Sequence, residues 1–281
     1  MNFIDAHVHV YAGDDPRYPE FPGAPPRDPI APRSFTPEEL FAHTKAAGVE
    51  RVNLIQIRFY GFDNSYLLDA IARYPQTFVG TAVIDPFAPD LERTMLSLRE
   101  RGIRAFRIHP RLSKEPAASW LRPDGYRKMF AIAARTRQVM SCLIDPDGLT
   151  ELDRMCSAYP ETPVVIDHLA RIGAEGFIRD ADVNALCGMA RHKQVYCKVG
   201  GFYALGKKKP PYSDLAPLIQ RVIAAFGPER CMWESDSPFQ IVPPHTYPAS
   251  LDLVRHRLEF LSDGDRDWLL RKTAERLLFG N

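Results

Sequence analysis

The sequence contains few cysteines, no long apolar run and no excess of charge of one sign. Its five cysteines are an odd number without a Cys-x-x-Cys pair, which favours reduced thiols in a cytoplasmic setting over a disulfide framework. The N-terminus lacks a basic region followed by an apolar run, and no stretch approaches the roughly 18 apolar residues of a membrane span, so neither a signal peptide nor a membrane helix is expected. A formal net charge of +1, with both signs interspersed, argues against nucleic acid or an anionic membrane surface as a partner.

Two nucleotide-binding motifs are also missing, the Gly-x-Gly-x-x-Gly turn and the Gly-Lys-Ser/Thr phosphate loop, which counts against an open nucleotide-binding sheet. What the sequence does contain is a regular alternation of strand-like and helix-like runs. Strands are expected at residues 1–10, 51–57, 77–84, 103–109, 138–144, 163–168, 195–199 and 230–236. Helices are expected at residues 37–48, 65–74, 91–101, 126–135, 149–159, 175–192 and 216–226, with two more between residue 247 and the end.

This alternation predicts right-handed βαβ units and a parallel sheet. Eight such units in 281 residues are typical of an α/β fold of the (β/α)8, or TIM, barrel type, with residues 1–281 forming a single domain. A doubly wound open sheet is the alternative. In a barrel the functional site lies at the carboxyl ends of the strands, which is where polar residues should then collect.

Residues 11–36 form a predicted loop, because their seven prolines interrupt both helices and interior strands. A loop of this length is usually either disordered or functional. It begins directly after two histidines, so a lid over the functional site is one interpretation and a disordered segment is the other. Thr36, Pro37 and Glu39 then form a predicted helix start with a capping box.

The first ten residues place two histidines on one predicted strand. Asp5, His7 and His9 alternate with apolar residues, so a period of two predicts that they share one face. The two imidazoles would then point the same way from the strand end, close enough to chelate one cation, and imidazole is a common ligand of zinc and related metals. A histidine pair on a surface strand is the alternative, which the apolar character of the opposite parity disfavours.

Ionisable residues also end most of the other predicted strands. Arg107 and His109 share one parity, as do Glu234 and Asp236, so each pair can face the barrel interior. Arg107 is either a structural ion-pair partner, for Glu234 or Asp5, or a guanidinium that holds an anionic substrate group. A buried Glu234 must be paired or protonated. The remaining strand-end residues are Gln56, Arg58, Lys198, His168 and Asp145, the last most simply interpreted as a turn residue.

Four stretches, Ile4–His9, Gly102–Arg107, Val165–Leu169 and Phe226–Pro238, carry a resemblance that spans almost the whole chain. Together they resemble the amidohydrolase superfamily, in the lactonase-like branch of its amidohydrolase-related (amidohydrolase 2) family, which contains sugar lactonases and pyrone-dicarboxylate lactonase. The resemblance implies a (β/α)8 fold in which the two first-strand histidines ligate a metal or polarise a carbonyl. It also implies the roles of sixth-strand histidine for His168 and eighth-strand aspartate for Asp236.

The chain departs from the superfamily pattern at two places. The fifth strand lacks the metal-binding histidine and offers only Asp145, as is usual in the lactonase branch, which leaves a metal-independent mechanism open. The final motif has Glu234 and Ser237 where the family usually has glycine and a bulky residue. The substrate is therefore expected to differ from those of the named relatives.

The leading hypothesis is hydrolysis of a carboxylate-bearing lactone by an activated water. Asp236 and His168 would be catalytic, with Asp236 accepting the proton of water and returning it to the leaving alkoxide. One divalent metal, with zinc as the first choice, would bind His7, His9 and Asp236, with His168 or His109 completing or flanking the set. Without metal, the imidazoles would donate hydrogen bonds to the oxyanion. The candidates for binding the acidic small-molecule substrate are Arg107, His109, Arg58, Lys198 and Tyr203.

Two other functions stay open at this point. The first is non-oxidative decarboxylation of an aromatic or muconate-type acid at the same site, which release of carbon dioxide would reveal. The second is a non-catalytic barrel that only binds its ligand, which the density of ionisable residues at the strand ends disfavours. The sequence also leaves the formation of a homo-oligomer open.

Overall fold

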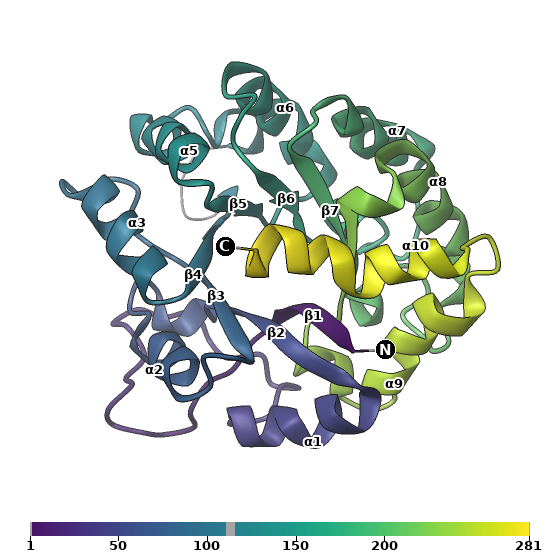
Figure 1. The fold of residues 1–281 in the computed structure, drawn as a ribbon, viewed down its shortest axis with the longest axis horizontal. Helices are drawn as coiled ribbons and strands as arrows, with labels where there is room; N and C mark the ends of the chain where they lie inside the picture. The colour runs from purple at the N-terminus through teal and green to yellow at the C-terminus, as the bar shows by residue number, and fades with distance from the viewer. Residues whose placement is uncertain (1, 111–115, 281) are drawn as a thin grey trace.

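The chain forms a ring of eight parallel strands surrounded by helices, seen in the computed structural model of Figure 1, which describes residues 2–110 and 116–280. The strands are β1 (Phe3–Val8), β2 (Val49–Ile55), β3 (Phe78–Ala82), β4 (Ile103–Ile108), β5 (Val139–Cys142), β6 (Val164–Ile166), β7 (Val195–Gly200) and β8 (Cys231–Glu234). The helices are α1 (Pro37–Ala47), α2 (Ser65–Arg73), α3 (Leu91–Glu100), α5 (Asp124–Thr136), α6 (Leu149–Ala158), α7 (Asp180–Gly188), α8 (Ala216–Phe226), α9 (Tyr247–Asp252) and α10 (Asp263–Asp267). Further helical turns continue from α10 to Phe279.

Each strand pairs in parallel with the next one in the sequence, in the order β1 to β8. The ring closes between β8 and β1, where Val8 forms a parallel bridge with Ser237. At this seam Asp236 N–H donates to the His7 carbonyl at 3.0 Å, and His9 N–H donates to the Ser237 carbonyl at 2.8 Å. The predicted (β/α)8 barrel is confirmed, and the open sheet is excluded.

Local sequence signals explain most element boundaries. At α1, Thr36 Oγ1 accepts from Glu39 N–H and the Glu39 carboxylate accepts from Thr36 N–H, which is the predicted capping box. The helix expected at residues 175–192 is shorter than predicted, because α7 begins only at Asp180. Gly173 and Gly176 before it adopt positive φ angles of 92° and 94°, a conformation that an α-helix does not contain.

The alternation predicted for the first strand is interrupted by a β-bulge. Between Asp5 and Val8, β1 advances three residues while β2 advances two. Ile4 and Ala6 lie in the barrel interior before this shift, and His7 faces the interior after it. The prediction that Asp5 and His7 share one face is therefore wrong, because a bulge reverses the side-chain alternation.

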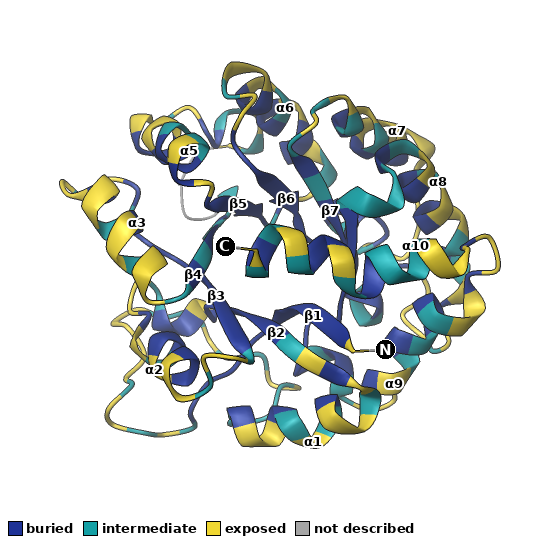
Figure 2. Cartoon of the chain, in the orientation of Figure 1, coloured by how far each residue is buried: buried dark blue, intermediate teal, exposed yellow. Residues whose placement is uncertain are grey.

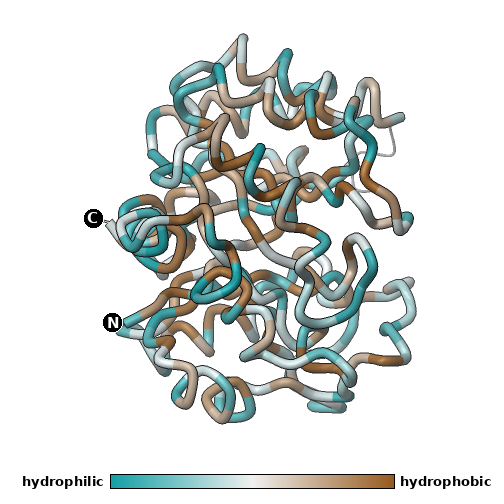
Figure 3. Tube along the Cα trace, turned by 90° about the vertical axis from the view of Figure 1, so that its right-hand side faces the viewer, coloured by the Kyte–Doolittle hydropathy of each residue, from teal (hydrophilic) through white to brown (hydrophobic). Residues whose placement is uncertain are grey.

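Side chains fill the barrel interior in layers, which is typical of this fold. The lowest layer is apolar and contains Ile4, Ala6, Val79, Ala105, Val139, Val165 and Met232. Ala274 and Leu278 of the C-terminal helical segment close it from below, and Figure 3 shows this segment at the same end of the barrel as the N-terminus. The layer above it is polar although it is buried, with Asn53, Thr81, Ser141, Asp167 and Lys198. Figure 2 shows the buried strands inside helices whose outer faces are exposed.

The proline-rich segment contains no helix or regular strand between residues 12 and 34. An antiparallel bridge between Tyr11 and Phe35 joins its two ends. Phe21 N–H donates to the Phe59 carbonyl at 3.1 Å, which holds the loop against the turn that follows β2. Its function as a lid stays a prediction. In the described part of the chain, every helix is too short or too polar to cross a membrane.

Candidate active site

Three histidines and one aspartate meet at the carboxyl ends of β1, β6 and β8. His7 Nε2 lies 3.3 Å from His9 Nε2, and Asp236 Oδ1 lies 3.5 Å and 3.3 Å from these two nitrogens. His168 Nε2 approaches the other carboxylate oxygen of Asp236 at 3.7 Å. All four side chains are buried, with 0–6% of each residue exposed. The closing seam of the barrel therefore brings together residues that are more than 220 positions apart in the sequence.

The donor atoms of this cluster fit a divalent metal. His7, His168 and Asp236 each offer a ligand atom, and these atoms lie within 4.8 Å of one another. The triangle formed with His9 has edges of 3.3–3.5 Å, close to the roughly 3.3 Å between ligands in a tetrahedral site with bonds of about 2.0–2.1 Å. Asp236 Oδ1 is buried and has no hydrogen-bond partner among the described residues, so this oxygen is available as a ligand.

Two of the histidine rings have an acceptor at the second nitrogen, as metal-binding imidazoles usually do. His9 Nδ1 lies 2.9 Å from the Ile55 carbonyl, so Nδ1 carries the proton and Nε2 carries the lone pair. His168 Nδ1 lies 2.8 Å from Glu234 Oε1. These two partners direct the Nε2 atoms of His9 and His168 toward Asp236. His7 Nδ1 instead faces the Lys198 ammonium at 3.3 Å, and the Asp167 carboxylate lies further away, at 3.8 Å.

Arg107 reaches the same cluster from β4. Its Nη1 lies 2.9 Å from His7 Nε2 and donates to that lone pair. Because Nε2 has a single lone pair, this hydrogen bond and a metal at His7 exclude each other. Neither ion-pair partner expected for Arg107 is found, since the nearest carboxylate oxygen belongs to Asp167, 4.0 Å from Arg107 Nε.

A buried ion pair supports the cluster from below. Lys198 Nζ lies 2.8 Å from Asp167 Oδ1 and 3.3 Å from His7 Nδ1. Ser141 Oγ donates to both oxygens of Asp167 at 3.0 Å. Burial alone would raise the pKa of Asp167, but Lys198, His7 and Arg107 outweigh it and hold the pKa well below its usual range. Lys198 is thus committed to an internal carboxylate.

The charges of the cluster follow from these contacts. Burial and the neighbouring Lys198 lower the pKa of His7, and burial lowers that of His9, so both rings are neutral near pH 7. His168 is different: burial acts against its charge, but Glu234 and Asp236 outweigh burial and raise its pKa. Burial raises the pKa of Asp236, yet His168, His9 and His7 together hold it below its usual range, so Asp236 is an anion.

Glu234 is paired, as its buried position required. Its Oε1 contacts the His168 ring, and burial raises the pKa of this carboxyl to about 7. Gly200 of β7 makes room for it, because a Cβ there would lie 2.3 Å from Glu234 Oε1. Glu234 stands where the family usually has glycine. It therefore contacts Nδ1 of His168, while Asp236 lies at Nε2 of the same ring.

Backbone conformation aims two of these side chains. Asp236 has φ 59°, which is left-handed and uncommon for a residue other than glycine. His168 begins four consecutive residues with φ between 51° and 54°, a left-handed turn directly after β6. Such conformations persist where surrounding contacts impose them, and they are concentrated at functional sites.

The other residues singled out from the sequence divide between the site and the surface. Tyr203 donates its hydroxyl to Asp236 Oδ2 at 2.7 Å, so it lies in the cluster. His109 is half-buried and directly follows β4. Arg58 is exposed and donates to the Pro26 carbonyl of the proline-rich loop at 2.6 Å, outside the cluster. Asp145 pairs with Arg171 at 3.1 Å.

Sequence reasoning missed Asp167 as a member of the site. The signal was present, because Asp167 shares the parity of Val165 and therefore points into the barrel. We assigned a role in the site to the adjacent His168 and none to Asp167. Its ring reaches the same cluster only through the left-handed turn, which the sequence does not announce.

The family model for amidohydrolases matches residues 4–280. The chain belongs to this amidohydrolase family. Among characterised proteins, it is 25% identical to 4-sulfomuconolactone hydrolase of Rhizobium radiobacter over 92% of this chain and 83% of that protein. It is 27% identical to L-fucono-1,5-lactonase of Burkholderia ambifaria, over 86% and 82%, and 27% identical to D-galactarolactone isomerase of Agrobacterium fabrum, over 92% and 85%.

Solved structures share the fold of this amidohydrolase. A probable 2-pyrone-4,6-dicarboxylic acid hydrolase from Acinetobacter baumannii superposes with a TM-score of 0.83 at 24% identity, covering 100% of both chains. An amidohydrolase from Burkholderia multivorans that contains bound zinc gives 0.82 at 20% identity, covering 99% of both chains. The 5-carboxyvanillate decarboxylase of Sphingomonas paucimobilis is more distant, with 0.66 at 14% identity over 99% of both chains.

Proposed function

We propose that this amidohydrolase opens a carboxylate-bearing lactone with a water molecule activated beside Asp236. The observation that carries the proposal is Asp236 Oδ1, a buried anionic oxygen without a hydrogen-bond partner in the described residues and within 3.5 Å of two imidazole nitrogens. A water at this oxygen would sit among groups that accept its proton and polarise a carbonyl. Lactonase names among the relatives support the same reaction class.

The chain's own residues supply the proton path. Asp236 is ionised, so it accepts the proton as water attacks the ring carbonyl. Tyr203 holds the second oxygen of Asp236, which fixes the direction of the free one. His168 has a raised pKa and Nε2 on the same side, so it can carry a proton to the leaving alkoxide.

We propose His7, His9 and Asp236 as the ligands of one divalent metal, zinc as the first choice, with His168 completing or flanking the set. Such an ion would supply a Lewis acid for the ring carbonyl and lower the pKa of water. The zinc in the related Burkholderia multivorans structure supports this choice. Without metal, the guanidinium of Arg107 beside His7 supplies positive charge at the same place.

Arg107 is the first candidate for the substrate carboxylate. Its side chain is 10% exposed, and only one of its N–H groups is used on His7. A guanidinium binds a carboxylate through two parallel hydrogen bonds. His109 and Tyr203 are further candidates at the mouth, whereas we assign Lys198 to positioning Asp167 and His7.

Product analysis in oxygen-18 water tests the reaction. The substrates are 2-pyrone-4,6-dicarboxylate, which carries carboxylates, and L-fucono-1,5-lactone, which does not. We expect the ring-opened acid with one oxygen-18 atom, formed faster from the carboxylate-bearing lactone. Release of carbon dioxide from carboxylated substrates would favour a decarboxylase, and an isomerised lactone without label would favour an isomerase; either would contradict the proposal.

A further inference from the structure

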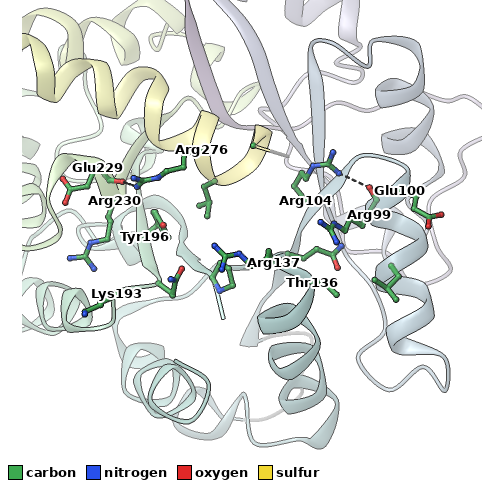
Figure 4. A pocket seen from close by; sticks show the side chains of 16 residues that line it. Arg99, Glu100, Arg104, Thr136, Arg137, Lys193, Tyr196, Glu229, Arg230 and Arg276 are labelled. Carbon is green, nitrogen blue, oxygen red and sulfur yellow. Dashed lines mark hydrogen bonds between the residues drawn. The ribbon is translucent and has the colours of Figure 1, made fainter. Parts of the chain in front are cut away.

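A second hollow lies at the end of the barrel opposite the active site, where β4 to β8 begin. Its volume is about 940 Å³, and its walls come from the end of α3, the turn after α5, the segments before β7 and β8, and the C-terminal helical segment (Figure 4). We call it the basic cavity. It shares no lining residue with the histidine and aspartate cluster, so it is a separate site.

Six cationic side chains line the basic cavity against only two acidic ones, Glu100 and Glu229. The cations are Arg99, Arg104, Arg137, Lys193, Arg230 and Arg276. Within residues 2–110 and 116–280, none of the six forms an ion pair with a carboxylate. Two arginines outside the cavity behave differently, since Arg135 of α5 pairs with Glu92 and Arg179, just before α7, pairs with Glu175, both at 2.6 Å. Among the described residues, the lining of the cavity therefore carries an excess of positive charge that no ion pair offsets.

Backbone carbonyls hold three of these cations in place. Arg104 Nη1 donates to the Arg99 carbonyl at 2.9 Å, and Arg276 Nη2 donates to the Glu229 carbonyl at 2.6 Å, as Figure 4 shows. Arg230 donates to three backbone carbonyls at 2.8–3.0 Å. A carbonyl orients a guanidinium without cancelling its charge. Burial is the main cause that lowers the pKa of Arg104, and the neighbouring charge of Arg99 adds to it.

The buried wall of the cavity also contains unused polar atoms. Thr136 and Gln138 are 7% and 1% exposed, and both line the cavity. Thr136 Oγ1 and Gln138 Oε1 have no hydrogen-bond partner among the described residues. Between them Arg137 takes φ 60°, a left-handed conformation at the end of α5 where glycine is usual.

We propose that the basic cavity binds a small polyanion, with phosphate oxyanions as the preferred chemistry. Each guanidinium can form paired hydrogen bonds with a phosphate group, and the excess of cations over acids matches a ligand with several negative charges. The volume lies in the range of small-molecule sites, about 300–1,000 Å³. Inorganic triphosphate is the simplest ligand with this chemistry.

Isothermal titration of the full chain at about 50 mM salt, where surface charges are only moderately screened, tests the proposal. The three ligands are inorganic triphosphate, orthophosphate and citrate. We expect saturable binding of one triphosphate per chain, at least about tenfold tighter than the other two. Equal or tighter binding of citrate would overturn the preference for phosphate, and no saturable binding of any of the three would overturn the site.

Substitutions inside and outside the basic cavity test where triphosphate binds. Arg104→Gln/Arg137→Gln should weaken triphosphate binding at least about tenfold, whereas Arg135→Gln/Arg179→Gln removes the same charge outside the cavity and should leave it unchanged. Equal weakening in both would show nonspecific attraction and overturn the proposal. Arg99→Gln/Lys193→Gln removes two other cations of the cavity and should also weaken binding, which gives a second reading if the first double variant does not fold. Asp236→Asn should bind triphosphate like the wild type, and loss of binding there would place the ligand in the active site instead.

Discussion

At the scale of single residues, Asp236 is the group on which the site converges. One carboxylate oxygen accepts the hydroxyl of Tyr203, and the other lies between His7 and His9 without a hydrogen bond from the described residues. The first oxygen is fixed so that the second can react or bind a cation. This division of tasks makes the tyrosine a positioning residue for the aspartate.

Tyr203→Phe should lower kcat/KM for lactone opening about 10- to 100-fold, the usual effect of removing a hydrogen bond that orients a reactive group. The free energy of unfolding should change by about 1 kcal/mol or less, since the carboxylate keeps its other neighbours. Steady-state kinetics and urea unfolding measure the two effects. Tyr159→Phe is the control, because that ring packs on Phe130 away from the site. Wild-type kinetics for Tyr203→Phe would contradict the assigned role.

Lys198→Met should destabilise the protein by about 3–5 kcal/mol, because it leaves the Asp167 carboxylate buried without its closest cation. Urea unfolding measures this loss. The double variant Lys198→Met/Asp167→Asn should recover part of it, since the buried charge is then gone. A loss below about 1 kcal/mol for the single variant would show that the pair is not the structural support described above.

The residues of the cluster were easier to predict from the sequence than the residues that hold them in place. His7, His9 and Asp236 stand at strand ends within motifs, so their approach could be predicted from the barrel. His168 was expected there from its strand end and the family resemblance, but the left-handed turn that brings its ring into the cluster was not predictable. The pairing of Glu234 with a partner followed from burial, but the identity of that partner did not. The inward direction of Asp167 followed from its parity with Val165, but its pairing with Lys198 did not. That pairing, and the lack of a hydrogen bond from the described residues to Asp236 Oδ1, depend on side-chain packing among eight strands.

At the scale of elements, the bulge in β1 and the helical segment at the C-terminus shape the barrel. The bulge turns His7 inward after Ile4 and Ala6 have filled the lowest layer. Period-two alternation in the sequence could not predict the bulge. A bulge is one extra residue in a strand, and it is recognised only when the pairing with the partner strand β2 is known. The strand and helix order was predictable, since polar turns separate each apolar run from the next.

Leu278→Ala tests whether the C-terminal segment closes the barrel. Leu278 is 1% exposed and packs in the lowest layer, so its truncation should cost about 2–5 kcal/mol of unfolding free energy. Leu277→Ala is the matched control on the same segment, where the side chain is only half-buried and a smaller loss is expected. Equal losses in the two variants, measured by urea unfolding, would contradict this packing.

At the scale of the whole molecule, the burial of the cysteines indicates how tightly the barrel is packed. Cys142, Cys156, Cys197 and Cys231 are buried, and Cys187 is half-buried. Burial raises the pKa of every one of these thiols, that of Cys156 to about 12. The reactive thiolate is therefore scarce at neutral pH.

Thiol labelling of the native protein at pH 8 should modify at most Cys187, more slowly than free cysteine. The rate should rise with pH, because a raised pKa delays formation of the thiolate. Cys187→Ser should abolish labelling, and guanidinium chloride should expose all five thiols. Rapid labelling of two or more native thiols would contradict the burial described here.

The proposed function depends above all on Asp236 as the group that activates water for lactone opening. The most direct test is kcat/KM for opening of 2-pyrone-4,6-dicarboxylate by Asp236→Asn, with Asp252→Asn as a control far from the site. We expect a loss of at least about a thousandfold for Asp236→Asn, in a protein that unfolds like the wild type, and an unchanged value for Asp252→Asn. Hydrolysis by Asp236→Asn at the wild-type rate would contradict this role.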